Sequence, residues 1–326
     1  MNSFGKLFKV SIYGESHGEA VGVLIDNVKP GISLSISDFD NDLKRRQGGQ
    51  LNTTSRKETD TPNILSGLFD GKTTGAPMLI NFNNENTNSK DYSNLVNHPR
   101  PSHADLTFKN KYGNNDYRGG GHSSGRLTVG IVAAGVIAKK MVPFTVKSEI
   151  VQIGIEKNKE NFEEYISNIK KDEDSVGAIV EITISNIENA IGEPFFYSVE
   201  SAISQILFSI GGVKGVEFGV GFSGVEKLGS EFNDVIINEF GKTKTNNNGG
   251  INGGIANGND IIIRVFVKPT PSISKGQNTY NFETKKIEEL NIVGRHDPCI
   301  AKRAMVVLEN ACMIALCDLF LLNGGK

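Results

Sequence analysis

The chain has 326 residues, of which 38% are apolar and 22% charged, and its net charge is -2 at pH 7. These values are ordinary for a soluble globular protein, and without a positive excess neither nucleic acid nor an anionic membrane is expected as the main partner. Three cysteines without a Cys-x-x-Cys pair argue against a disulfide framework and favour a reducing compartment. The first ten residues lack an apolar signal core, so we expect a cytoplasmic protein.

Turn residues separate short apolar runs in the first half of the chain. An apolar, β-branched run before Pro30-Gly31 predicts a strand, and cap residues precede a short helix that reaches Arg46. The long polar stretch from residue 83 to 116 is typical of a functional or disordered loop. The elements expected here are strands over 21–28, 64–69 and 77–82, a helix over 37–46 and a polar loop over 48–60.

The second half contains the longest apolar patterns. Small residues on several faces of 127–141 predict a helix that is packed on all sides. The run 301–322 is broken by Glu309 and Asp318, so it predicts a buried helix rather than a membrane span. Strands and helices do not alternate regularly, which favours a mixed α+β fold, and we expect one domain over 1–326. The other expected elements are strands over 175–187 and 260–268, a helix over 198–208 and a candidate linker over 246–259.

Two glycine-rich segments are similar to nucleotide-binding loops. Residues 67–73 have one residue too few between their glycines for a phosphate loop, and they precede Pro77 rather than a helix. Residues 249–254 do not match the dinucleotide fingerprint and are more typical of a flexible turn. Neither segment is therefore interpreted as a nucleotide site.

Four of the five histidines lie in segments rich in Gly, Ser and Arg. Histidine is the side chain whose ordinary pKa lies nearest neutrality. Glycine lets the backbone approach a ligand, and arginine binds carboxylates and phosphates through a fixed fork of donors. The pattern predicts proton chemistry beside an anion, and hence an enzyme. The segments are GESHG at 14–18, RPSHAD at 100–105, GGGHSSGR at 119–126 and GRHDPC at 294–299.

Each of these segments also has a purely structural interpretation. Ser123 and Ser124 could cap the helix at 127, and with Arg126 they could equally form an anion pocket at its N-terminus. Arg45 and the adjacent Arg46 could be a solvated helix end. Taken together, the segments favour a site over a set of unrelated structural details.

Three widely separated segments resemble one family, chorismate synthase. They are GESHG with the following VGVLIDNVKPG, then GGGHSSGRLTVGIVAAGVIAKK, and finally GRHDPCIAKRAMVVLE. RPSHAD, KYGNNDYR, LSGLFDGKTTGAP, NNNGGINGGIANG and VKPTPSIS follow the family's order and spacing. The resemblance covers essentially the whole chain.

The resemblance implies a fold and a reaction. The implied fold is a sandwich of α-helices between antiparallel β-sheets, assembled as a homotetramer. The implied reaction is a 1,4-anti-elimination that converts 5-enolpyruvylshikimate 3-phosphate to chorismate and phosphate, the last step of the shikimate pathway that feeds aromatic amino-acid biosynthesis. It needs reduced FMN without net redox change. Because no inserted segment suggests a built-in reductase, NADPH would act indirectly, through a separate flavin reductase.

The resemblance also implies roles for individual residues. His17 matches the histidine that protonates the departing phosphate, and His103 matches the one that protonates the reduced flavin. Ser16, Ser124 and Asp297 match groups that orient the flavin and the proton transfer. The implied flavin-binding residues are His122, Ser123, Ser124, Gly211, Gly212, Gly253, Lys268, Pro269, Thr270, Pro271, Ser272 and Arg295. The implied substrate-binding residues are Arg45, Arg46, Asn52, Arg56, Arg126 and Arg295, and no metal is expected.

Several positions depart from the family pattern. Gly125-Arg126-Leu127 replaces an Ala-Arg-Glu, and three other positions lack an arginine. Gln47, Asn52 and His122 stand where the family commonly has arginine, and the loop over 48–56 is one residue short. Losing one cationic contact costs on the order of 1.5–3 kcal/mol, or about tenfold or more in affinity. We therefore predict reduced affinity for flavin or substrate with turnover retained.

Two other functions remain as alternatives. A metal-dependent hydrolase could bring together His17, His103, His122, Asp297 and Cys299, although His-x-x-x-His spacings do not occur. The second alternative is a catalytically weakened homologue that binds an anion or a flavin.

Overall fold

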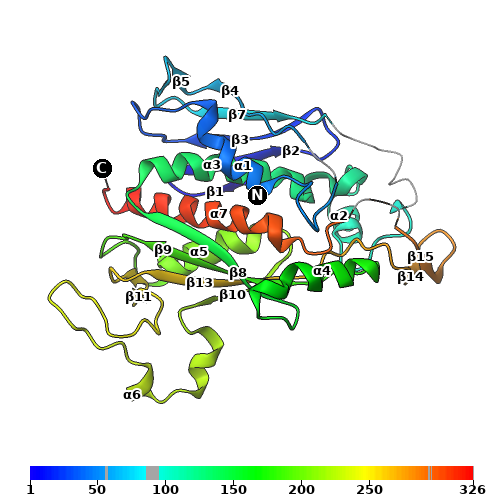
Figure 1. Cartoon of the computed structure of the whole chain (residues 1–326). Helices are drawn as coiled ribbons and strands as arrows, with labels where there is room; N and C mark the ends of the chain where they lie inside the picture. Colours follow the sequence, from blue (N-terminus) through cyan, green and yellow to red (C-terminus); the bar gives the residue numbers. More distant parts are fainter. Residues whose placement is uncertain (56–57, 86–94, 293, 295, 326) are drawn as a thin grey trace.

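The computed structural model describes residues 1–55, 58–85, 95–292, 294 and 296–325. A layer of helices lies between a five-stranded and a four-stranded antiparallel sheet (Figure 1), so the predicted α+β sandwich is confirmed. The first sheet contains β1 (Ser3–Phe4), β2 (Lys9–Gly14), β3 (Ala20–Asp26), β7 (Met78–Asn83) and β4 (Asn63–Ser66), in that order. The second contains β10 (Val213–Phe218), β13 (Ile261–Val267), β9 (Ala178–Ser185) and β8 (Thr145–Ile153), in that order.

The helices divide into a central group and a peripheral group. The central helices are α1 (Asp40–Arg46), α3 (Thr128–Met141), α5 (Val199–Ser209) and α7 (Ala301–Leu322). The peripheral helices are α2 (Asp105–Tyr112), α4 (Phe162–Lys171) and α6 (Gly229–Phe232). Short 3-10 turns include η1 (Ile36–Phe39), η3 (Arg118–Ser123), η4 (Gly125–Leu127), η5 (Lys159–Asn161), η6 (Phe195–Tyr197) and η7 (Gly221–Glu226).

The second sheet covers the helices with one face only. Along β9 every second side chain is buried, as expected when successive side chains point to opposite faces of a sheet. Ile182 and Ile184 of β9 and Ile263 of β13 are completely buried on the helical side. Strands β8 and β9 contact α7 there, and β10 contacts α5.

Glycines let α3 approach its neighbours closely. A Cβ added at Gly130 would lie 3.1 Å from the carbonyl oxygen of Gly22 in β3. A Cβ at Gly135 would lie 2.3 Å from the side chain of Asn310 in α7. The small residues of 127–141 are therefore required because α3 is packed between the first sheet and α7, as the sequence predicted.

Helix α7 is the centre of the core. By length and composition it could cross a membrane, but 83% of its most apolar 18-residue window is buried inside the protein. One continuous cluster of buried apolar residues includes side chains from α7, the other central helices and both sheets. The prediction of a buried helix over 301–322 is confirmed with the same boundaries.

Most other predicted elements are confirmed with small shifts of their ends, but the prediction of a loop over 83–116 is partly wrong. That stretch contains α2, in which no residue is buried, so its sequence carries no apolar face. The candidate linker over 246–259 contains the hairpin of β11 (Ile251–Asn252) and β12 (Ile255–Ala256). A further hairpin that the sequence did not suggest joins β14 (Gln277–Asn281) and β15 (Lys286–Leu290).

The rejected phosphate loop at 67–73 is a hairpin. Strands β5 (Leu68–Phe69) and β6 (Lys72–Thr73) are joined by Asp70 and Gly71, both with positive φ angles. Two central residues with positive φ are the requirement of a tight type I′ hairpin turn. The segment therefore serves as a turn, in agreement with its sequence.

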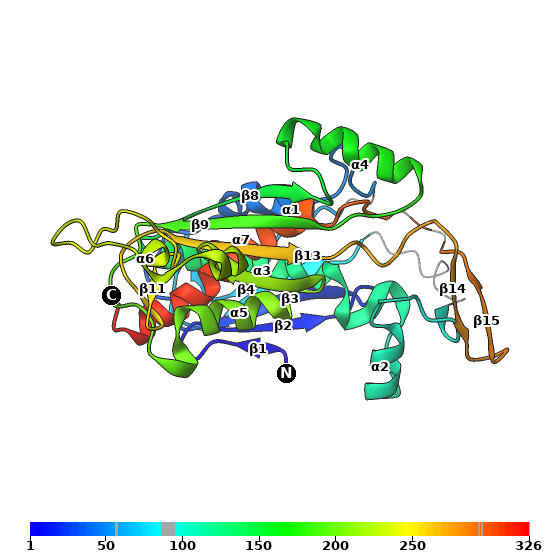
Figure 2. The ribbon, with the colours of Figure 1, turned by 90° about the horizontal axis from the view of Figure 1, so that it is seen from below.

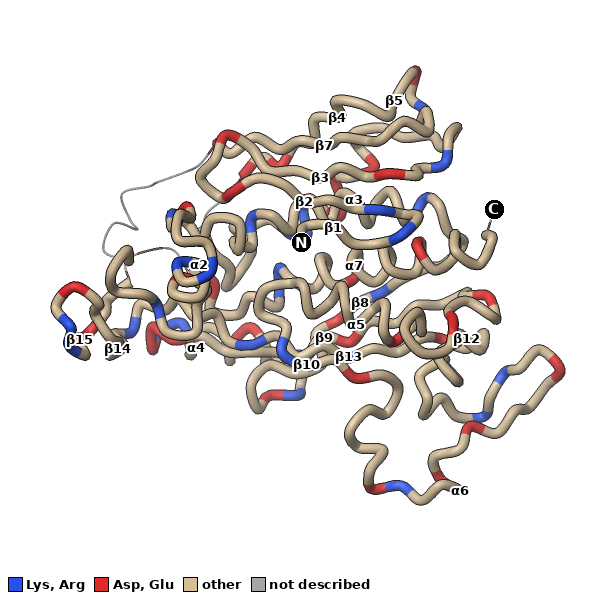
Figure 3. Tube along the Cα trace, turned by 180° about the vertical axis from the view of Figure 1, so that it is seen from behind, with Lys and Arg blue, Asp and Glu red and all other residues tan. Residues whose placement is uncertain are grey.

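The two ends of the molecule differ. Figure 2 shows α2 and the β14–β15 hairpin at one end and the segment that carries α6 at the other. Cations and carboxylates are interspersed along the trace (Figure 3), as the small net charge suggests.

Candidate active site

Two neighbouring cavities contain most of the residues singled out in the sequence. The smaller, of about 240 Å³, is lined by Arg46, Arg126 and Arg303, and we call it the arginine cavity. The larger, of about 630 Å³, is lined by His103 and His122, and we call it the histidine cavity. The larger volume lies in the range of small-molecule and cofactor sites. The cavities share Ser124, Gly125, Thr128, Ile210, Gly211 and Ile300 as wall residues, so they adjoin each other.

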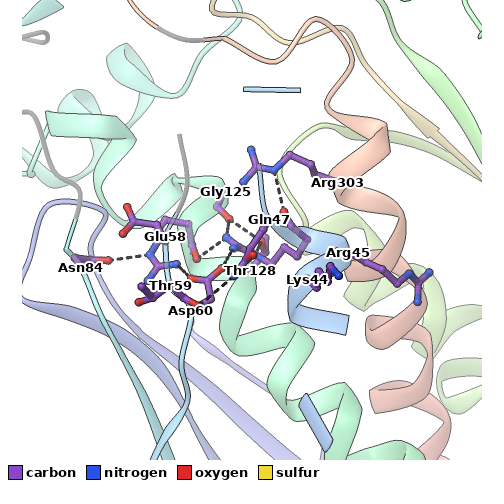
Figure 4. Close-up of polar contacts among 12 residues, drawn as sticks. Lys44, Arg45, Gln47, Glu58, Thr59, Asp60, Asn84, Gly125, Thr128 and Arg303 are labelled. Atoms are coloured by element: carbon purple, nitrogen blue, oxygen red, sulfur yellow. Dashed lines mark hydrogen bonds and ion pairs between the residues drawn. The ribbon is translucent and has the colours of Figure 1, made fainter. Parts of the chain in front are cut away.

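A buried carboxylate joins two of the arginines. Asp60 lies in the loop before β4 with a positive φ of 49°, and its side chain is 1% exposed. Its Oδ2 accepts a hydrogen bond of 3.0 Å from Arg46, and its Oδ1 accepts one from Arg126. Asp60 therefore sets the spacing between two guanidinium groups that come from different elements (Figure 4).

Arg46 ends α1 and is almost completely buried. Besides Asp60, it donates to the hydroxyl of Thr128 at 3.1 Å and to the carbonyl oxygens of Gly125 at 2.9 Å and Arg126 at 3.1 Å. Burial lowers the pKa of Arg46 to about 10, and the nearby guanidinium groups of Arg303 and Arg126 act in the same direction. Arg46 still carries a positive charge at neutral pH.

Arg126 is held in η4 by acceptors from the first sheet. Its Nε donates to Asn84 Oδ1 at 2.8 Å, and Nη2 donates to the carbonyl oxygen of Asn83 at 3.1 Å. Ser124 caps this turn, because its hydroxyl accepts from the backbone N–H of Arg126 at 3.3 Å. The structural interpretation of Ser124 as a cap is therefore confirmed, and its functional role stays a prediction for a residue that lines both cavities.

Asp297 and Arg303 form another part of the wall of the arginine cavity. Asp297 accepts from Arg303 Nη1 at 2.7 Å and from the backbone N–H of Thr54 at 2.8 Å. Arg303 also donates to the carbonyl oxygen of Arg46 at 2.9 Å. Sequence reasoning missed Arg303 and Asp60, although Arg303 lies in the run that follows GRHDPC.

The charges that line the arginine cavity balance. The three guanidinium groups face the carboxylates of Glu58, Asp60 and Asp297 in the same wall. An anionic ligand must therefore share or replace contacts that these carboxylates now make.

His103 enters the histidine cavity from the turn before α2. Its Nδ1 lies 2.7 Å from Asp105 Oδ1, and its side chain is 19% exposed. A Cβ added at Gly120 would lie 3.3 Å from His103 Cε1 and 3.6 Å from Ser123 Oγ. Because Gly120 also has a φ of +85°, a glycine is needed for the loop to pass this close to the histidine.

The stretch from Lys268 to Ser272, together with Gly211 and Gly212, lines the same cavity, and its predicted role in flavin binding stays a prediction. Lys268 donates to the carbonyl oxygen of Ser102 at 2.7 Å. Burial lowers the pKa of Lys268, and the positive charge of Lys214, another lining residue, lowers it further. Two lysines in one wall favour an anionic group there.

His122 holds the N-terminal strand against the histidine cavity. Its Nδ1 lies 2.7 Å from the carbonyl oxygen of Gly14, and its Nε2 lies 3.1 Å from Asn2 Oδ1. Ser123 donates to the carbonyl oxygen of Gly120 at 2.7 Å. Both residues line the cavity, and His122 has backbone and side-chain partners on its two ring nitrogens.

Ser16 and His17 lie against the glycine run that carries this wall, although neither residue is part of the lining of the two cavities. A Cβ at Gly119 would lie 2.7 Å from the imidazole of His17 and 2.8 Å from Ser16 Oγ. Ser16 is completely buried, and its hydroxyl has no hydrogen-bond partner among the residues that the structure describes. Successive glycines of one loop therefore contact His17 and His103.

Some predicted site residues lie elsewhere. Arg45 points away from Asp60 (Figure 4) and donates twice to Glu309, at 3.2 and 2.7 Å. Asn52 donates to Glu163 of α4, and Gly253 lies in the turn between β11 and β12. None of the three lines either cavity. Arg56 and Arg295 lie outside the described residues.

The alternative of a metal site finds no set of ligands in the part of the chain that the structure describes. No three His, Cys, Asp or Glu side chains gather there in a way that could hold a metal ion.

Comparisons with known proteins agree with the geometry. The family model of chorismate synthase matches residues 8–321. The chain is 50% identical to the chorismate synthase of Chitinophaga pinensis, over 99% of this chain and 97% of that protein, and 42% identical to that of Methanocaldococcus jannaschii, again over 99% and 97%. A crystal structure of chorismate synthase superposes with a TM-score of 0.77 at 25% identity, covering 99% of this chain and 94% of the other. The chain therefore belongs to the chorismate synthase family, whose activity is that of a lyase in the shikimate pathway.

Proposed function

We propose that the two adjoining cavities convert 5-enolpyruvylshikimate 3-phosphate to chorismate and phosphate by cleaving a carbon–oxygen bond. One observation carries this proposal: a cavity with three guanidinium groups adjoins a larger cavity lined by a histidine, with Ser124 in the wall of both. The substrate has two carboxylates and a phosphate. Arginine forks bind such groups through paired, charge-assisted hydrogen bonds.

The arginine cavity is the proposed substrate site. Arg46 and Arg126 are fixed by Asp60 and by backbone acceptors, so their guanidinium groups need little further ordering when a ligand arrives. Arg303 completes the set from the first turn of α7. Asp297 holds Arg303 in place, which supports the orienting role expected for this carboxylate.

The histidine cavity fits a flavin mononucleotide. Its wall combines apolar side chains for a ring system with serine and threonine for polar edges, and Lys214 and Lys268 suit a phosphate group. When bound, the reduced flavin would lend electron density transiently to the elimination, without net redox change. The apolar lining includes Leu127, Ile131, Ile206, Ile210, Pro269 and Pro271.

The protein's own groups would manage the protons. His103 lines the histidine cavity, and it is proposed to hold a proton beside the flavin. His17 is proposed to protonate the departing phosphate. Its contact with Gly119 supports that role, because the same loop continues to His122 and Ser123 in the wall of the histidine cavity. Ser16 and Ser124 are proposed to orient these transfers.

The alternative of a catalytically weakened homologue is not favoured, given 50% identity to a chorismate synthase over nearly the whole chain. Reduced affinity with retained turnover stays a prediction. Of the three departures, Gln47 lines the arginine cavity and donates to the carbonyl oxygen of Thr59 at 3.1 Å. Asn52 contacts α4 instead, so Gln47 and His122 are the positions through which the predicted loss would act.

A homotetramer is the proposed assembly, and one segment supports it. Between β10 and β11 the chain leaves the body of the protein (Figure 1) with apolar side chains that are each more than half exposed. Exposed apolar groups of this density are typical of a protein–protein interface. They are Phe222, Val225, Leu228, Val235, Ile236, Ile237 and Phe240.

Three further expectations belong to the proposal. The chain would fold as one domain, which the continuous apolar core supports. It would act in the cytoplasm. Its FMN would be reduced elsewhere, by a separate reductase that uses NADPH.

Anaerobic phosphate release tests the proposed function. Purified protein with excess reduced FMN should release phosphate from 5-enolpyruvylshikimate 3-phosphate. His103→Ala and His17→Ala should fold and lose turnover by about 100-fold or more, as expected for removal of a proton-transferring group. No phosphate release by the wild-type protein, with the substrate shown to be intact, would refute the proposal.

A further inference from the structure

Asp105 binds His103, although it is not itself part of the lining of the histidine cavity. The carboxylate is 9% exposed, and its Oδ1 lies 2.7 Å from His103 Nδ1. Arg100 donates to the same oxygen at 2.7 Å and to Oδ2 at 2.8 Å, and its other terminal nitrogen donates to Ser272 Oγ at 3.0 Å. The carboxylate of Asp105 therefore contacts both a histidine and an arginine.

The contact decides which nitrogen of His103 carries a proton. Burial alone would raise the pKa of Asp105, but hydrogen bonds from Arg100 and His103 outweigh burial and hold the pKa well below its usual range. Asp105 is therefore ionised and can only accept hydrogen bonds. Arg100 Nη2 lies 3.1 Å from His103 Nδ1, but the ionised oxygen of Asp105 is closer, at 2.7 Å. Two lone pairs at that distance would repel, so Nδ1 donates a proton to Asp105. The free position is then Nε2.

The opposite edge of the imidazole faces the cavity loop. A Cβ at Gly120 would meet His103 Cε1 at 3.3 Å and Nε2 at 3.7 Å, so this edge is turned toward the glycine run. His103 is also part of the cavity lining. The ring is thus held at Nδ1 by Asp105, and its Nε2 lies on the side of the glycine run that continues into Ser123 of the cavity wall.

We propose that Asp105 is a positioning residue that fixes the Nδ1–H tautomer of His103 and leaves Nε2 as the atom that exchanges a proton in the histidine cavity. The inference deepens the proposed function and rests on it for its effect on turnover. Its structural part, the tautomer, does not depend on that reaction.

Asp105→Asn tests the positioning role in the complete protein with reduced FMN. An asparagine amide can donate to Nδ1, which favours the other tautomer and removes the lone pair from Nε2. We expect kcat to fall by about 10–100-fold while KM and the flavin Kd change by less than about threefold. Asp105→Glu should recover a large part of the lost kcat.

Arg100→Gln is the matched comparison for a merely structural role. It removes the guanidinium group that contacts Asp105, Ser272 and, at 3.1 Å, His103 Nδ1, but keeps the contact between Asp105 and His103. We expect its flavin Kd to rise and its kcat at saturating flavin to fall by only about threefold. If Asp105→Asn and Arg100→Gln lower kcat and flavin affinity to the same extent, Asp105 serves only to anchor Arg100 and the proposal fails.

A chemical readout separates this proposal from the proposed function. Diethyl pyrocarbonate reacts with an unprotonated imidazole nitrogen, and peptide mass spectrometry can follow the modification of His103 without flavin or substrate. Asp105→Asn should slow modification at His103 at least threefold, by the tautomer argument above, and Asp105→Glu should not. Equal rates in wild type and Asp105→Asn would overturn the proposal even if the protein makes chorismate. If modification is slower in Asp105→Asn and the wild-type protein has no turnover, the positioning role of Asp105 is supported and the proposed reaction is refuted.

Discussion

Arg45 and Arg46 are neighbours in sequence with opposite surroundings. Arg45 is about one third exposed and donates to both oxygens of Glu309 in a cluster with Asp42 and Lys139. Arg46 is 4% exposed and directs most of its donors to uncharged oxygens in the wall of the arginine cavity. Both arginines are paired and both border an open space, but only Arg46 shares its cavity wall with two further arginines.

The contrast shows how a buried charge acquires a structural or a binding role. In the cluster around Glu309, two cations and two carboxylates join α1, α3, α7 and β8 directly. This cluster borders a hollow of about 680 Å³ that has one arginine in its wall, whereas three guanidinium groups line the arginine cavity of about 240 Å³. The Glu309 cluster should therefore determine stability, and the arginine cavity should determine activity.

The largest expected difference comes from one substitution made at both positions. Arg46→Lys keeps the charge but loses the fork that reaches four acceptors, so kcat/KM for the enolpyruvyl substrate should fall by about 100-fold. Arg45→Lys keeps a cation beside Glu309 and should change kcat/KM by less than about threefold. Steady-state phosphate release measures both. Equal losses in the two variants would contradict the division of roles.

Glu309→Gln should lower the stability of the protein and have little effect on turnover. It leaves Arg45 and Lys139 with one carboxylate, Asp42, in a largely buried cluster. Because both cations are partly exposed, we expect a loss of about 2–3 kcal/mol in the free energy of unfolding, below the value for a fully buried pair. Urea unfolding at fixed protein concentration measures the loss. A stable variant with impaired turnover would reverse the assignment.

The pH dependence of stability sharpens the same assignment. Burial opposes the effect, but the surrounding cations hold the pKa of Glu309 and of Asp42 below the usual range. A lowered folded-state pKa contributes stability above the unfolded-state pKa of about 4, and that stability disappears as the pH falls through the folded-state pKa. Unfolding free energies measured from pH 6 downward should decrease more steeply in wild type than in Glu309→Gln. Parallel curves would exclude the contribution of Glu309.

The smallest expected effect concerns inorganic phosphate, the simplest anion for the arginine cavity. At about five times its Kd, phosphate should stabilise the wild-type protein by about 1 kcal/mol, and Arg303→Met should abolish this gain. Arg264→Met is the matched control, because Arg264 is also a partly exposed arginine and pairs with Glu181 and Glu217 on the second sheet. Thermal unfolding with and without phosphate measures the shift. Equal protection of Arg303→Met and Arg264→Met would place the anion elsewhere.

The fold could be predicted best where one pattern dominates. The ends of helix α7 and of the tightly packed α3 agree with the prediction within a residue or so. Both helices are buried on most sides, so their sequences are apolar over a long stretch. Helix α2 was missed because its side chains bury no face. Strands such as β8 and β10 were not found either, since their exposed faces interrupt the apolar pattern.

Two of the three histidines predicted for the site, His103 and His122, line a cavity, whereas His17 does not, and the roles of all three stay predictions. The charged residues were harder to predict. Adjacent residues of a helix point about 100° apart, so the pair Arg45-Arg46 could not both face one cavity, and the sequence does not say which one does. Asp60 was missed because its partners Arg46 and Arg126 lie far along the chain, and their meeting depends on the tertiary fold.

A crystal structure with 5-enolpyruvylshikimate 3-phosphate and oxidised FMN tests the account most directly. We predict that the phosphate and carboxylates of the substrate contact Arg46, Arg126 and Arg303, and that the flavin lies in the histidine cavity beside His103. Substrate bound instead against Arg45 and Lys139, with the arginine cavity unchanged, would contradict it.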